Sequence, residues 1–259
     1  MTKYNKAVAL WQKNNITTDA ELSEALNAYS ILFAYHSCKI ENMDITYHDT
    51  REIFEHDRVI SYTGSLRTLF EIRNAAEANE LFLTAFNDKR PLDEEFIKEL
   101  QYCLTKNTYD TRRRQIGEHS GEYRHHNYIA GRKRTGTAPE NVHNEVSELL
   151  KELQCTEVNN ILMMTAYFHV KFENIHPFAD GNGRTGRLAM NYFLVSNNHP
   201  PVIIYEEDRK AYYDALEAWD VEQDSKPFCD FLKQQTEKTW EKQLQRAERK
   251  NGDVYNRGN

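Results

Sequence analysis

Residues 158–187 read VNNILMMTAYFHVKFENIHPFADGNGRTGR, and this stretch sets the expected fold. Its first part, residues 158–174, is apolar on nearly every face, which is typical of a helix buried at the centre of an α-helical domain. Pro177 disfavours helical backbone angles in the residue before it. We therefore expect the central helix to end near Ile175 and a loop to begin at His176.

Outside this stretch, residues that break helices are scarce. The 259 residues include 10 glycines and 6 prolines, about 6% together, where average usage is roughly 12%. Seven of the ten glycines fall in two windows, 117–136 and 181–186, and residues 1–63 contain none. A β-sandwich or a propeller needs turn residues every 8 to 12 positions or so, and this distribution therefore excludes both. We expect an all-α protein.

Apolar residues at steps of three and four predict further helices on both sides of the central one. Thr18 and Glu21 form a capping-box pair, which predicts the start of a helix that runs to about Glu41. The other expected helices are residues 65–86, a segment after Pro91, a segment with Pro139 in its first turn, residues 184–196, residues 208–220, and a last helix from about Ser225 that frays beyond Lys250. Residues 117–137 differ, because their glycines bracket a pattern typical of a short β-hairpin.

Composition and charge exclude several classes of protein. The formal net charge of -7 argues against binding nucleic acid through bulk charge. The basic runs 112–114 and 132–134 are interpreted as solvated loops. Because the chain has no long apolar run and no apolar core of a signal peptide near its N-terminus, we expect no membrane contact and a cytoplasmic location. The four cysteines form no C-x-x-C pair and are interpreted as reduced thiols.

The loop after the central helix combines the features of an anion site. Gly181, Asn182 and Gly183 tolerate positive φ, so that successive backbone N–H groups can converge on an anion. The next helix begins immediately, with the positive end of its dipole toward the same point. Arg184 and Arg187 lie three residues apart in its first turn and can face one anion, as a polyphosphate requires.

Two further residues of this loop carry chemistry. Asp180 would be misplaced among phosphates unless it holds a cation, and Mg²⁺ shared with the phosphate oxygens is the expected one. His176 is the base at the mouth of the loop that titrates near neutral pH. A plain turn explains the glycines but not a base, an acid and two arginines within twelve residues. A P-loop is excluded, because no G-K-[ST] follows the glycines.

Residues 176–187, HPFADGNGRTGR, resemble the signature His-x-Phe-x-[Asp/Glu]-Gly-Asn-Gly-Arg-x-x-Arg of the Fic family, with every defining position present. The resemblance implies an all-α Fic fold, a helical bundle around the central buried helix with one short β-hairpin, the flap. It also implies a protein adenylyltransferase that transfers AMP from ATP to a Ser, Thr or Tyr hydroxyl of a target protein. His176 would deprotonate that hydroxyl, which attacks the α-phosphorus and expels pyrophosphate.

The same resemblance assigns the nucleotide contacts of the loop. Asp180 would bind Mg²⁺ on the α- and β-phosphates. The residues from Gly181 to Gly183 would line the anion hole, with Asn182 on the α-phosphate. Arg184 would lie on the β-phosphate side, and Arg187 would bind the γ-phosphate.

Other residues of the loop and of the following helix also have expected places. Phe178 is interpreted as an anchor buried under the loop, and Thr185 as an exposed or helix-face residue. Tyr212 and Tyr213 resemble the segment that borders the adenine in many relatives. An ordinary aromatic face that packs on the core is the alternative for these two tyrosines. Asp220 occupies a position that is often Asn.

Residues 121–139 resemble the family's flap, which pairs with the main chain of the target so that its hydroxyl meets the catalytic histidine. The usual hydrophobic pair of the flap is not obvious in this chain. We take His126, Asn127 and Tyr128 as the target-positioning residues.

A second motif lies near the end of the helix that begins after Thr18. Ser37 and Glu41 are four residues apart and share one helix face. Residues 37–42, SCKIEN, resemble the family's inhibitory motif [Ser/Thr]-x-x-x-Glu-[Gly/Asn]. In that case Glu41 would pair with Arg187 in bidentate fashion and withhold it from the γ-phosphate, so that ATP binds without reacting.

The resemblance also divides the chain and names its partners. The expected parts are an N-terminal helical region at 1–90 that carries the inhibitory helix at about 19–41, a Fic core at 91–223 with the flap at 117–137 and the catalytic loop at 176–187, and a charged C-terminal helix and tail at 224–259. Expected partners are ATP, a target protein, the chain itself through self-modification, and a second copy in a homodimer.

Three alternative functions stay open. Glu41 could position a water molecule for the removal of AMP from a modified protein. The enzyme could transfer phosphate, UMP or phosphocholine instead of AMP, although the complete arginine pair favours a triphosphate bound in the usual direction. A non-catalytic ATP-binding module is the third alternative, which would not require His176.

Overall fold

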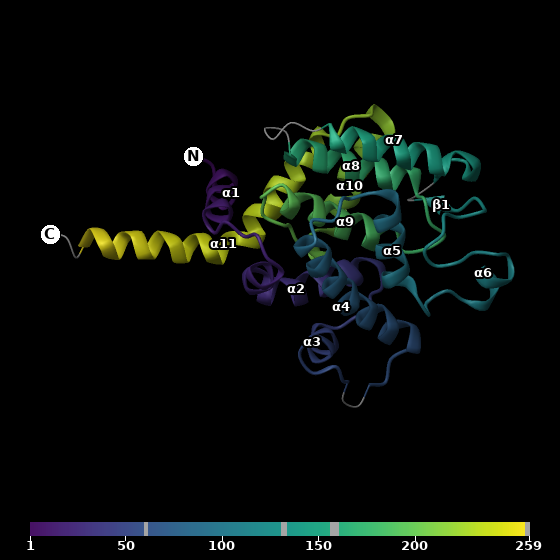
Figure 1. The fold of residues 1–259 in the computed structure, drawn as a ribbon, viewed down its shortest axis with the longest axis horizontal. Coiled ribbons are helices and arrows are strands. Elements are labelled where there is room, and N and C mark those ends of the chain that lie inside the picture. Colours follow the sequence, from purple (N-terminus) through teal and green to yellow (C-terminus); the bar gives the residue numbers. More distant parts are fainter. Residues whose placement is uncertain (60–61, 131–133, 156–160, 257–259) are drawn as a thin grey trace.

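The computed structural model describes residues 1–59, 62–130, 134–155 and 161–256, which form a bundle of α-helices (Figure 1). The bounds of the elements are α1 (Lys3–Lys13), α2 (Asp19–Glu41), α3 (Tyr47–His56), α4 (Leu66–Asn87), α5 (Glu94–Thr105), α6 (Thr111–Gln115), β1 (Ile129–Ala130), β2 (Arg134–Thr135), η1 (Pro139–Asn141), α7 (Val142–Gln154), α8 (Ile161–Ile175), α9 (Asn182–Ser196), η3 (Glu206–Asp208), α10 (Arg209–Glu222) and α11 (Lys226–Asn256). The predicted all-α fold class is confirmed. Among the helices described, none has the length and apolar content needed to cross a membrane.

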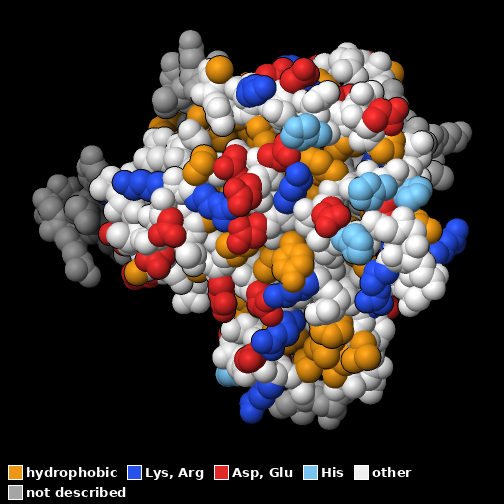
Figure 2. Space-filling view, turned by 45° about the vertical axis from the view of Figure 1, so that its right-hand side comes forward, with side chains coloured by type: hydrophobic (Ala, Val, Ile, Leu, Met, Phe, Trp, Pro, Cys, Tyr) orange, Lys and Arg blue, Asp and Glu red, His pale blue; other side chains and the backbone are white. Residues whose placement is uncertain are grey.

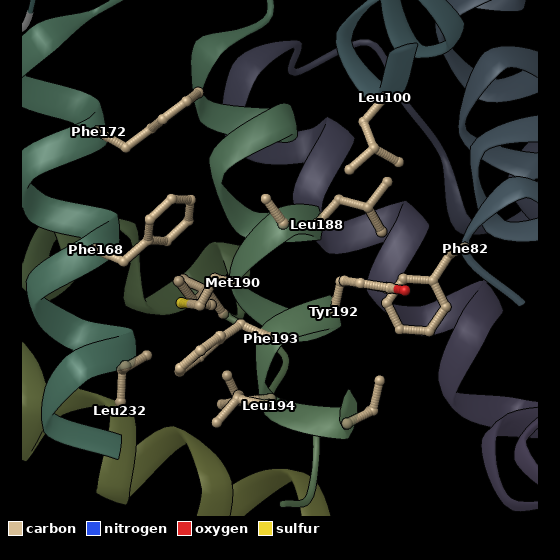
Figure 3. Packing of buried hydrophobic residues seen from close by; sticks show 14 of the residues in the cluster. Phe82, Leu100, Phe168, Phe172, Leu188, Met190, Tyr192, Phe193, Leu194 and Leu232 are labelled. Atoms are coloured by element: carbon tan, nitrogen blue, oxygen red, sulfur yellow. The ribbon is translucent and has the colours of Figure 1, made fainter. Parts of the chain in front are cut away.

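Helices α8 and α9 lie next to each other in the middle of the bundle. Phe168 of α8 lies beside Met190 and Phe193 of α9 in the buried core (Figure 3). On the other side of α9, the ring of Tyr192 meets Phe82 of α4, with 5.6 Å between ring centroids. The core therefore has α9 between α8 on one side and α4 with α5 on the other.

Of these two helices, α9 is the more completely buried, although the sequence favours α8. Every residue at 184–195 is buried, whereas Met163 of α8 is 38% exposed. The hydrophobicity of the sequence does not predict the burial of α9, because several of its buried side chains are polar. They are Asn182, Arg184, Thr185, Arg187 and Asn191. Buried polar groups require partners, and α9 is therefore where a functional site is to be sought.

Helix α2 brings the N-terminal part of the chain to α9. It begins with the predicted capping box, in which Glu21 N–H donates to Thr18 Oγ1 at 3.3 Å and Thr18 N–H donates to Glu21 Oε2 at 3.0 Å. The helix ends at Glu41, as its spacing predicts, and packs against α4 and α9. Its last turn thus lies within reach of the polar side chains of α9.

Three helices are absent from the prediction, and one is longer than predicted. Helix α1 packs its Trp11 against Trp240 of α11, with 5.2 Å between ring centroids. Helices α3 and α6 are short and begin at the capping residues Thr46 and Asp110. Short helices depend on tertiary packing more than on propensity, which explains why periodicity did not reveal them. Helix α11 runs to Asn256, although fraying beyond Lys250 was predicted, and its end projects from the body (Figure 1).

The predicted hairpin at 117–137 is much smaller than expected. Strands β1 and β2 have two residues each and pair antiparallel, with Ile129 opposite Thr135. Residues 131–133, which include part of the predicted basic run, lie outside the described residues. The ends of the segment are bonded to the end of α8 and the residues after it: Arg124 N–H donates to Pro177 O at 3.0 Å, and Thr137 N–H donates to Ile175 O at 3.1 Å.

Candidate active site

A cleft of about 1410 Å³ lies where the end of α2, the first turns of α4 and α9, the end of α8 and the side of α10 meet. The predicted site residues that line it are Glu41, Tyr128, His176, Asp180, Gly181, Asn182, Gly183, Arg184, Tyr212 and Tyr213. Ser37 and Arg187 are buried behind its wall. On the face drawn in Figure 2, acidic side chains gather to the left of the middle, and histidines with basic side chains lie to the right. The described part of this face therefore shows no single basic surface.

Two residues in left-handed backbone conformations form the turns of the catalytic loop, residues 176–187. His176 has φ 52° and Gly181 has φ 81°. The glycine is required in any case, because a Cβ at this position would lie 2.5 Å from Thr105 Cγ2. Phe178 is fully buried beneath the loop, as predicted, where its ring meets Tyr123.

The side chain of Asn182 holds the loop together rather than facing the cleft with free polar atoms. Its Nδ2 donates to Phe178 O at 2.8 Å, and its Oδ1 accepts Phe178 N–H at 2.9 Å. The predicted contact between Asn182 and an α-phosphate would therefore have to use the backbone N–H of Asn182. Gly181, the N-cap of α9, offers no side-chain acceptor to the first turn. The N–H groups of that turn are the donors that an anion would use.

His176 is held as a neutral base at the head of the loop. The backbone N–H of His176 donates to Phe172 O at 3.0 Å, and the backbone carbonyl of His176 accepts a hydrogen bond from Nε of Arg124 at 2.7 Å. Burial, together with the nearby charge of Arg124, lowers the pKa of His176 to about 4. The imidazole is therefore uncharged at neutral pH, which is the form that can accept a proton.

Arg124 was not predicted as a site residue. This buried guanidinium donates to backbone carbonyls of three segments, at His126 O (2.9 Å), at His176 O, and at Thr137 O. It thereby joins two parts of the flap segment to the backbone of His176. A fork of five N–H donors suits this task, and a lysine would not reproduce it.

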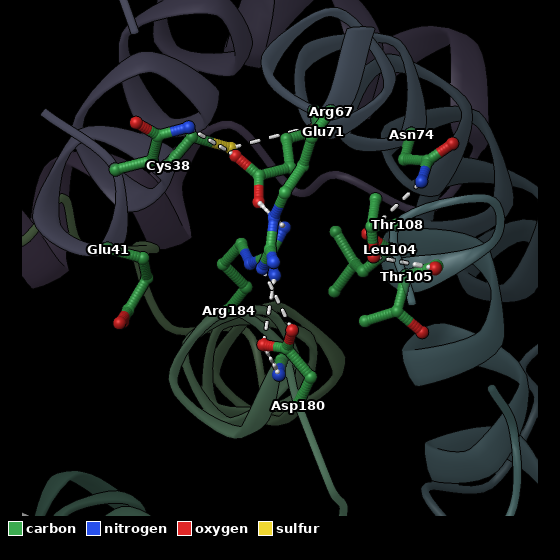
Figure 4. Close-up of polar contacts among 12 residues, drawn as sticks. Cys38, Glu41, Arg67, Glu71, Asn74, Leu104, Thr105, Thr108, Asp180 and Arg184 are labelled. Atoms are coloured by element: carbon green, nitrogen blue, oxygen red, sulfur yellow. Dashed lines mark hydrogen bonds and ion pairs between the residues drawn. The ribbon is translucent and has the colours of Figure 1, made fainter. Parts of the chain in front are cut away.

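Asp180, the predicted metal ligand, lies among three arginines. Its Oδ2 accepts Nη2 of Arg67 at 2.9 Å and lies 3.7 Å from Nη1 of Arg113. Its Oδ1 accepts Gly181 N–H at 2.8 Å and lies 3.7 Å from Nη2 of Arg184. Figure 4 shows Asp180 directly below the stacked arginine side chains.

The donor set at Asp180 fits a magnesium ion that shares phosphate oxygens. Mg²⁺ commonly takes one or two protein carboxylates and completes its shell with water and substrate phosphates. Over residues 1–59, 62–130, 134–155 and 161–256, no group of three His, Cys, Asp or Glu side chains is placed to hold a metal. Asp180 would therefore be the protein ligand, and the phosphates would supply the rest.

Arg184 and Thr185 are both buried in the first turns of α9. Arg184 lies between Glu71 and Asp180, with its nitrogens 3.8 Å and 3.7 Å from their carboxylate oxygens. Thr185 is fully buried on α9, so exposure, one of its two predicted alternatives, is wrong, and the other, a position on a helix face, agrees with the structure. The reason is the packing of α9 on all sides, which its polar composition does not reveal.

Arg187 is fully buried and contacts the predicted inhibitory motif. Its Nε donates to Ser37 Oγ at 3.0 Å, and its Nη2 donates to Ser37 O at 2.9 Å and to Glu41 Oε1 at 2.8 Å. The predicted bidentate pair with Glu41 is wrong, because one nitrogen alone reaches that carboxylate. Nε donates to Ser37 Oγ instead, and Nη1 donates to the hydroxyl of Tyr212 at 3.3 Å.

Burial lowers the pKa of Arg187, and the charges of its neighbours raise it. Tyr212, Glu41 and Glu173 together outweigh the loss of hydration and hold the pKa of Arg187 above its ordinary value. Burial also raises the pKa of Glu173 to about 8, although Arg187 opposes that shift. Glu173 lines the cleft on α8, directly before the residues that end the helix, and was not predicted as a site residue.

The two predicted adenine residues have different environments. Tyr212 is buried, and its hydroxyl lies 2.9 Å from Nε2 of His169, so it belongs to the core as well as to the cleft wall. Tyr213 is half-buried beneath the guanidinium of Arg209, 5.6 Å from the ring centroid. Asp220 accepts Nδ2 of Asn174 at 2.7 Å at the same end of the cleft.

The predicted target-positioning residues lie at the rim. His126 Nδ1 and the hydroxyl of Tyr128 both contact the buried Glu118, at 2.9 Å and 3.2 Å. Asn127 is exposed. Among these three residues, Tyr128 is the one that lines the cleft.

The site residues missed by sequence reasoning share one property. Arg67, Glu71 and Glu173 are charged residues in ordinary helix positions without a motif around them, and Arg124 lies in the flap-like segment but was given no role there. A possible signal was available only for Arg124, which follows a glycine-containing segment at the start of the flap. Their roles depend on which helices meet at the cleft.

Comparison with known proteins agrees with this geometry. A model of the Fic/DOC family matches residues 91–194. The chain is 29% identical to the protein adenylyltransferase Fic of Culex quinquefasciatus over 226 residues, 85% of this chain and 43% of that protein. It is 31% identical to the protein of the same name from Drosophila mojavensis over 216 residues, 79% and 39% of the two chains. The chain thus spans less than half the length of these curated relatives.

Solved structures share the fold. A Fic domain containing signaling protein from Bacteroides thetaiotaomicron superposes with a TM-score of 0.78 at 22% identity, covering 95% of this chain and 98% of that one. Fic-1 from C. elegans superposes with a TM-score of 0.76 at 22% identity, covering 96% and 72%.

Proposed function

This chain belongs to the Fic family, and from that premise we propose that it transfers AMP from ATP to a Ser, Thr or Tyr hydroxyl of a protein. The observation that carries the proposal is the arrangement at one cleft of a neutral His176, the uncapped first turn of α9 and Arg184, with Arg187 buried behind the wall. The relatives named above are protein adenylyltransferases.

In the proposed reaction, Nε2 or Nδ1 of His176 takes the proton of the target hydroxyl. The hydroxyl oxygen forms a bond to the α-phosphorus as the bond to pyrophosphate breaks. Backbone N–H groups at 181–183 stabilise charge on the phosphate oxygens, and Arg184 and Arg187 hold the leaving phosphates. The low pKa of His176 belongs to the protein alone, and the negative charge of a bound triphosphate would raise it toward the pH of the reaction.

We propose Mg²⁺ as the metal, with Asp180 as its protein ligand. When bound, the ion would neutralise negative charge on the phosphates. Asp180 itself is oriented by the N–H of Gly181, which keeps its carboxylate at the turn where the phosphates would lie.

The Arg187–Glu41 contact supports the proposal of a built-in brake. Arg187 cannot donate the same Nη2 hydrogen atoms to Ser37, Glu41 and a phosphate at once. Glu41 also brings a negative charge to the cleft, where it would repel the γ-phosphate. We propose that release of Glu41 frees Arg187 and permits productive binding of ATP.

A second candidate function rests on the position of Glu41 beside the anion site. A Cβ at Gly183 would collide with Oε1 of Glu41, so this carboxylate lies directly against the first turn of α9. In the reverse reaction a carboxylate at that place would position a water molecule for attack on the phosphorus of an AMP–protein bond. Removal of AMP from a modified protein is therefore the alternative.

The remaining parts of the proposal follow the family. Target recognition by residues 126–128, self-modification, a homodimer, a cytoplasmic location and the division at residues 90 and 223 are proposed on the resemblance of the sequence. The half-exposed Tyr128 at the rim of the cleft supports the first of these.

The experiment compares four proteins incubated with labelled ATP and Mg²⁺: the parent, Glu41→Gly, Glu41→Gly with His176→Ala, and Glu24→Gly. We expect Glu41→Gly to raise incorporation of label at least about tenfold, and His176→Ala to remove it, since loss of a general base costs about 100-fold or more. Glu24→Gly is the matched control, because Glu24 is an exposed glutamate on the same helix.

Mass spectrometry of the products identifies the nucleotide transferred and the modified residue. Repetition with GTP, CTP and UTP tests the choice of nucleotide. A Glu41→Gly protein that is no more active than the parent would contradict the brake. Binding of ATP without any covalent product, even in that variant, would support a binding module, and release of AMP from a modified protein by the parent would support the reverse reaction.

A further inference from the structure

Arg67, in the first turn of α4, lies on the carboxylate that is proposed to bind the metal ion. Its Nη2 donates to Oδ2 of Asp180 at 2.9 Å. A second guanidinium, that of Arg113, is 3.7 Å from the same oxygen, and Oδ1 accepts the N–H of Gly181. Both carboxylate oxygens of Asp180 therefore already have donors.

Arg67 is held in this position from behind. Its Nε donates to Oε1 of the buried Glu71 at 3.0 Å, and Oε2 of Glu71 accepts Nδ2 of Asn42 at 2.7 Å. Asn42 directly follows Glu41 and is the C-cap of α2. Hydrogen bonds thus connect the end of α2 to Asp180 through Glu71 and Arg67 (Figure 4).

The positive charge of this guanidinium would oppose a divalent cation at the same carboxylate. Mg²⁺ or Mn²⁺ binds a carboxylate oxygen at about 2.0 to 2.2 Å, and Arg67 brings a like charge to the same oxygen. The side chain of Arg67 is 44% exposed, so it can leave Asp180 for water without disrupting the core. The side chain of Glu71 is 4% exposed and keeps its other partners when Arg67 moves.

We propose that Arg67 competes with the divalent cation for Asp180 and thereby sets the cation concentration that the site requires. The proposal rests on the proposed function, in which Asp180 binds the metal of a metal–nucleotide complex. In this proposal, each end of the loop at 176–187 has a charged partner from an N-terminal helix. Glu41 of α2 holds the arginine that would bind phosphate, and Arg67 of α4 holds the carboxylate that would bind the cation.

The test measures binding rather than turnover. Affinity for α,β-methylene ATP, which cannot be cleaved between the α- and β-phosphates, is determined by calorimetry at increasing Mn²⁺ concentrations in the Glu41→Gly background. The Mn²⁺ midpoint is the Mn²⁺ concentration at which the rise in nucleotide affinity is half complete. We expect Arg67→Gln to lower this midpoint about fivefold, the scale of an exposed ion pair. Arg67→Lys keeps the charge and is expected to stay near the parent.

Two controls identify the cause. Arg73→Gln removes an arginine of the same helix that pairs with Asp57 and Glu77 away from the cleft, and should leave the Mn²⁺ midpoint unchanged. Asp180→Asn should remove the effect of Arg67→Gln. Thermal unfolding of each variant shows whether it is folded.

An unchanged midpoint in a folded Arg67→Gln protein would overturn the proposal. A higher midpoint, or weaker nucleotide binding at saturating Mn²⁺, would also overturn it and identify Arg67 as a phosphate ligand instead. AMP transfer by the Glu41→Gly protein at saturating Mn²⁺ is measured separately. Transfer with an unchanged midpoint refutes this inference alone, whereas a shifted midpoint without transfer refutes the proposed function and leaves the competition at Asp180 standing.

Discussion

The two ends of the catalytic loop meet partners from the N-terminal helices in different ways. At the Arg187 end, a fully buried guanidinium donates to Ser37, Glu41 and Tyr212. At the Asp180 end, the side chain is 17% exposed and its partner Arg67 is 44% exposed. A buried network is costly to break, and an exposed pair exchanges easily with water or ions. One end of the loop is therefore held firmly, and the other is open to replacement of its partner.

Lysine substitutions test this difference most directly. We expect Arg187→Lys to lower the free energy of unfolding by about 3 kcal/mol, because a lysine leaves several of the buried acceptors at Ser37 and Tyr212 without donors. Arg67→Lys should change it by no more than about 0.5 kcal/mol, since the pair is exposed. Urea unfolding of both variants measures the two values. Equal losses would show that burial does not separate the two ends.

The serine of the inhibitory motif offers a smaller test at the Arg187 end. Ser37→Ala removes the acceptor of Arg187 Nε but leaves the Ser37 carbonyl and Glu41 in place. We expect a loss of about 1 to 2 kcal/mol in the free energy of unfolding, the scale of an unsatisfied buried donor. AMP transfer should rise, but by less than in Glu41→Gly.

Urea unfolding and transfer of labelled AMP check the two parts of that prediction. Ser23→Ala, an exposed serine on the same helix, is the control. Transfer as high as in Glu41→Gly would mean that Ser37, not the carboxylate, holds the arginine.

Nucleotide binding at the Arg187 end should also depend on pH through Glu173. Burial raises the pKa of Glu173 to about 8, so the group is largely neutral at pH 7 and becomes negative as the pH rises through about 8. The added charge partly cancels Arg187 and repels phosphate. In the parent protein, whose Glu41 contributes to this raised pKa, affinity for α,β-methylene ATP should therefore fall about threefold between about pH 7 and pH 9, an effect well under one pKa unit of interaction.

Calorimetry across this range measures that affinity. Glu173→Gln should bind with little dependence on pH. A fall of the same size in Glu173→Gln would place the titrating group elsewhere, and an affinity that rises with pH would reverse the assigned sign.

Features that depend on neighbouring residues were predicted well. The capping box at Thr18 and Glu21, the end of α8 before Pro177 and the buried Phe178 all follow from local conformational rules. Features that depend on packing were predicted poorly. The burial of Thr185 was not settled by its prediction as an exposed or helix-face residue, and the short helices α1, α3 and α6 were missed, because neither burial nor short-helix stability is encoded in local periodicity.

The candidate site divides in the same way. The sequence by itself determined the catalytic loop, because a histidine before a proline, a turn glycine and the start of a helix are set by backbone preferences within twelve residues. The tertiary structure alone decided which charges meet that loop. Arg67 lies 113 residues from Asp180 along the chain, and Glu41 lies 146 residues from Arg187. The first pairing had no signal in the sequence, and the second was expected from the family motif rather than from spacing. Ion pairs form through space, so they depend on how α2 and α4 pack against α9.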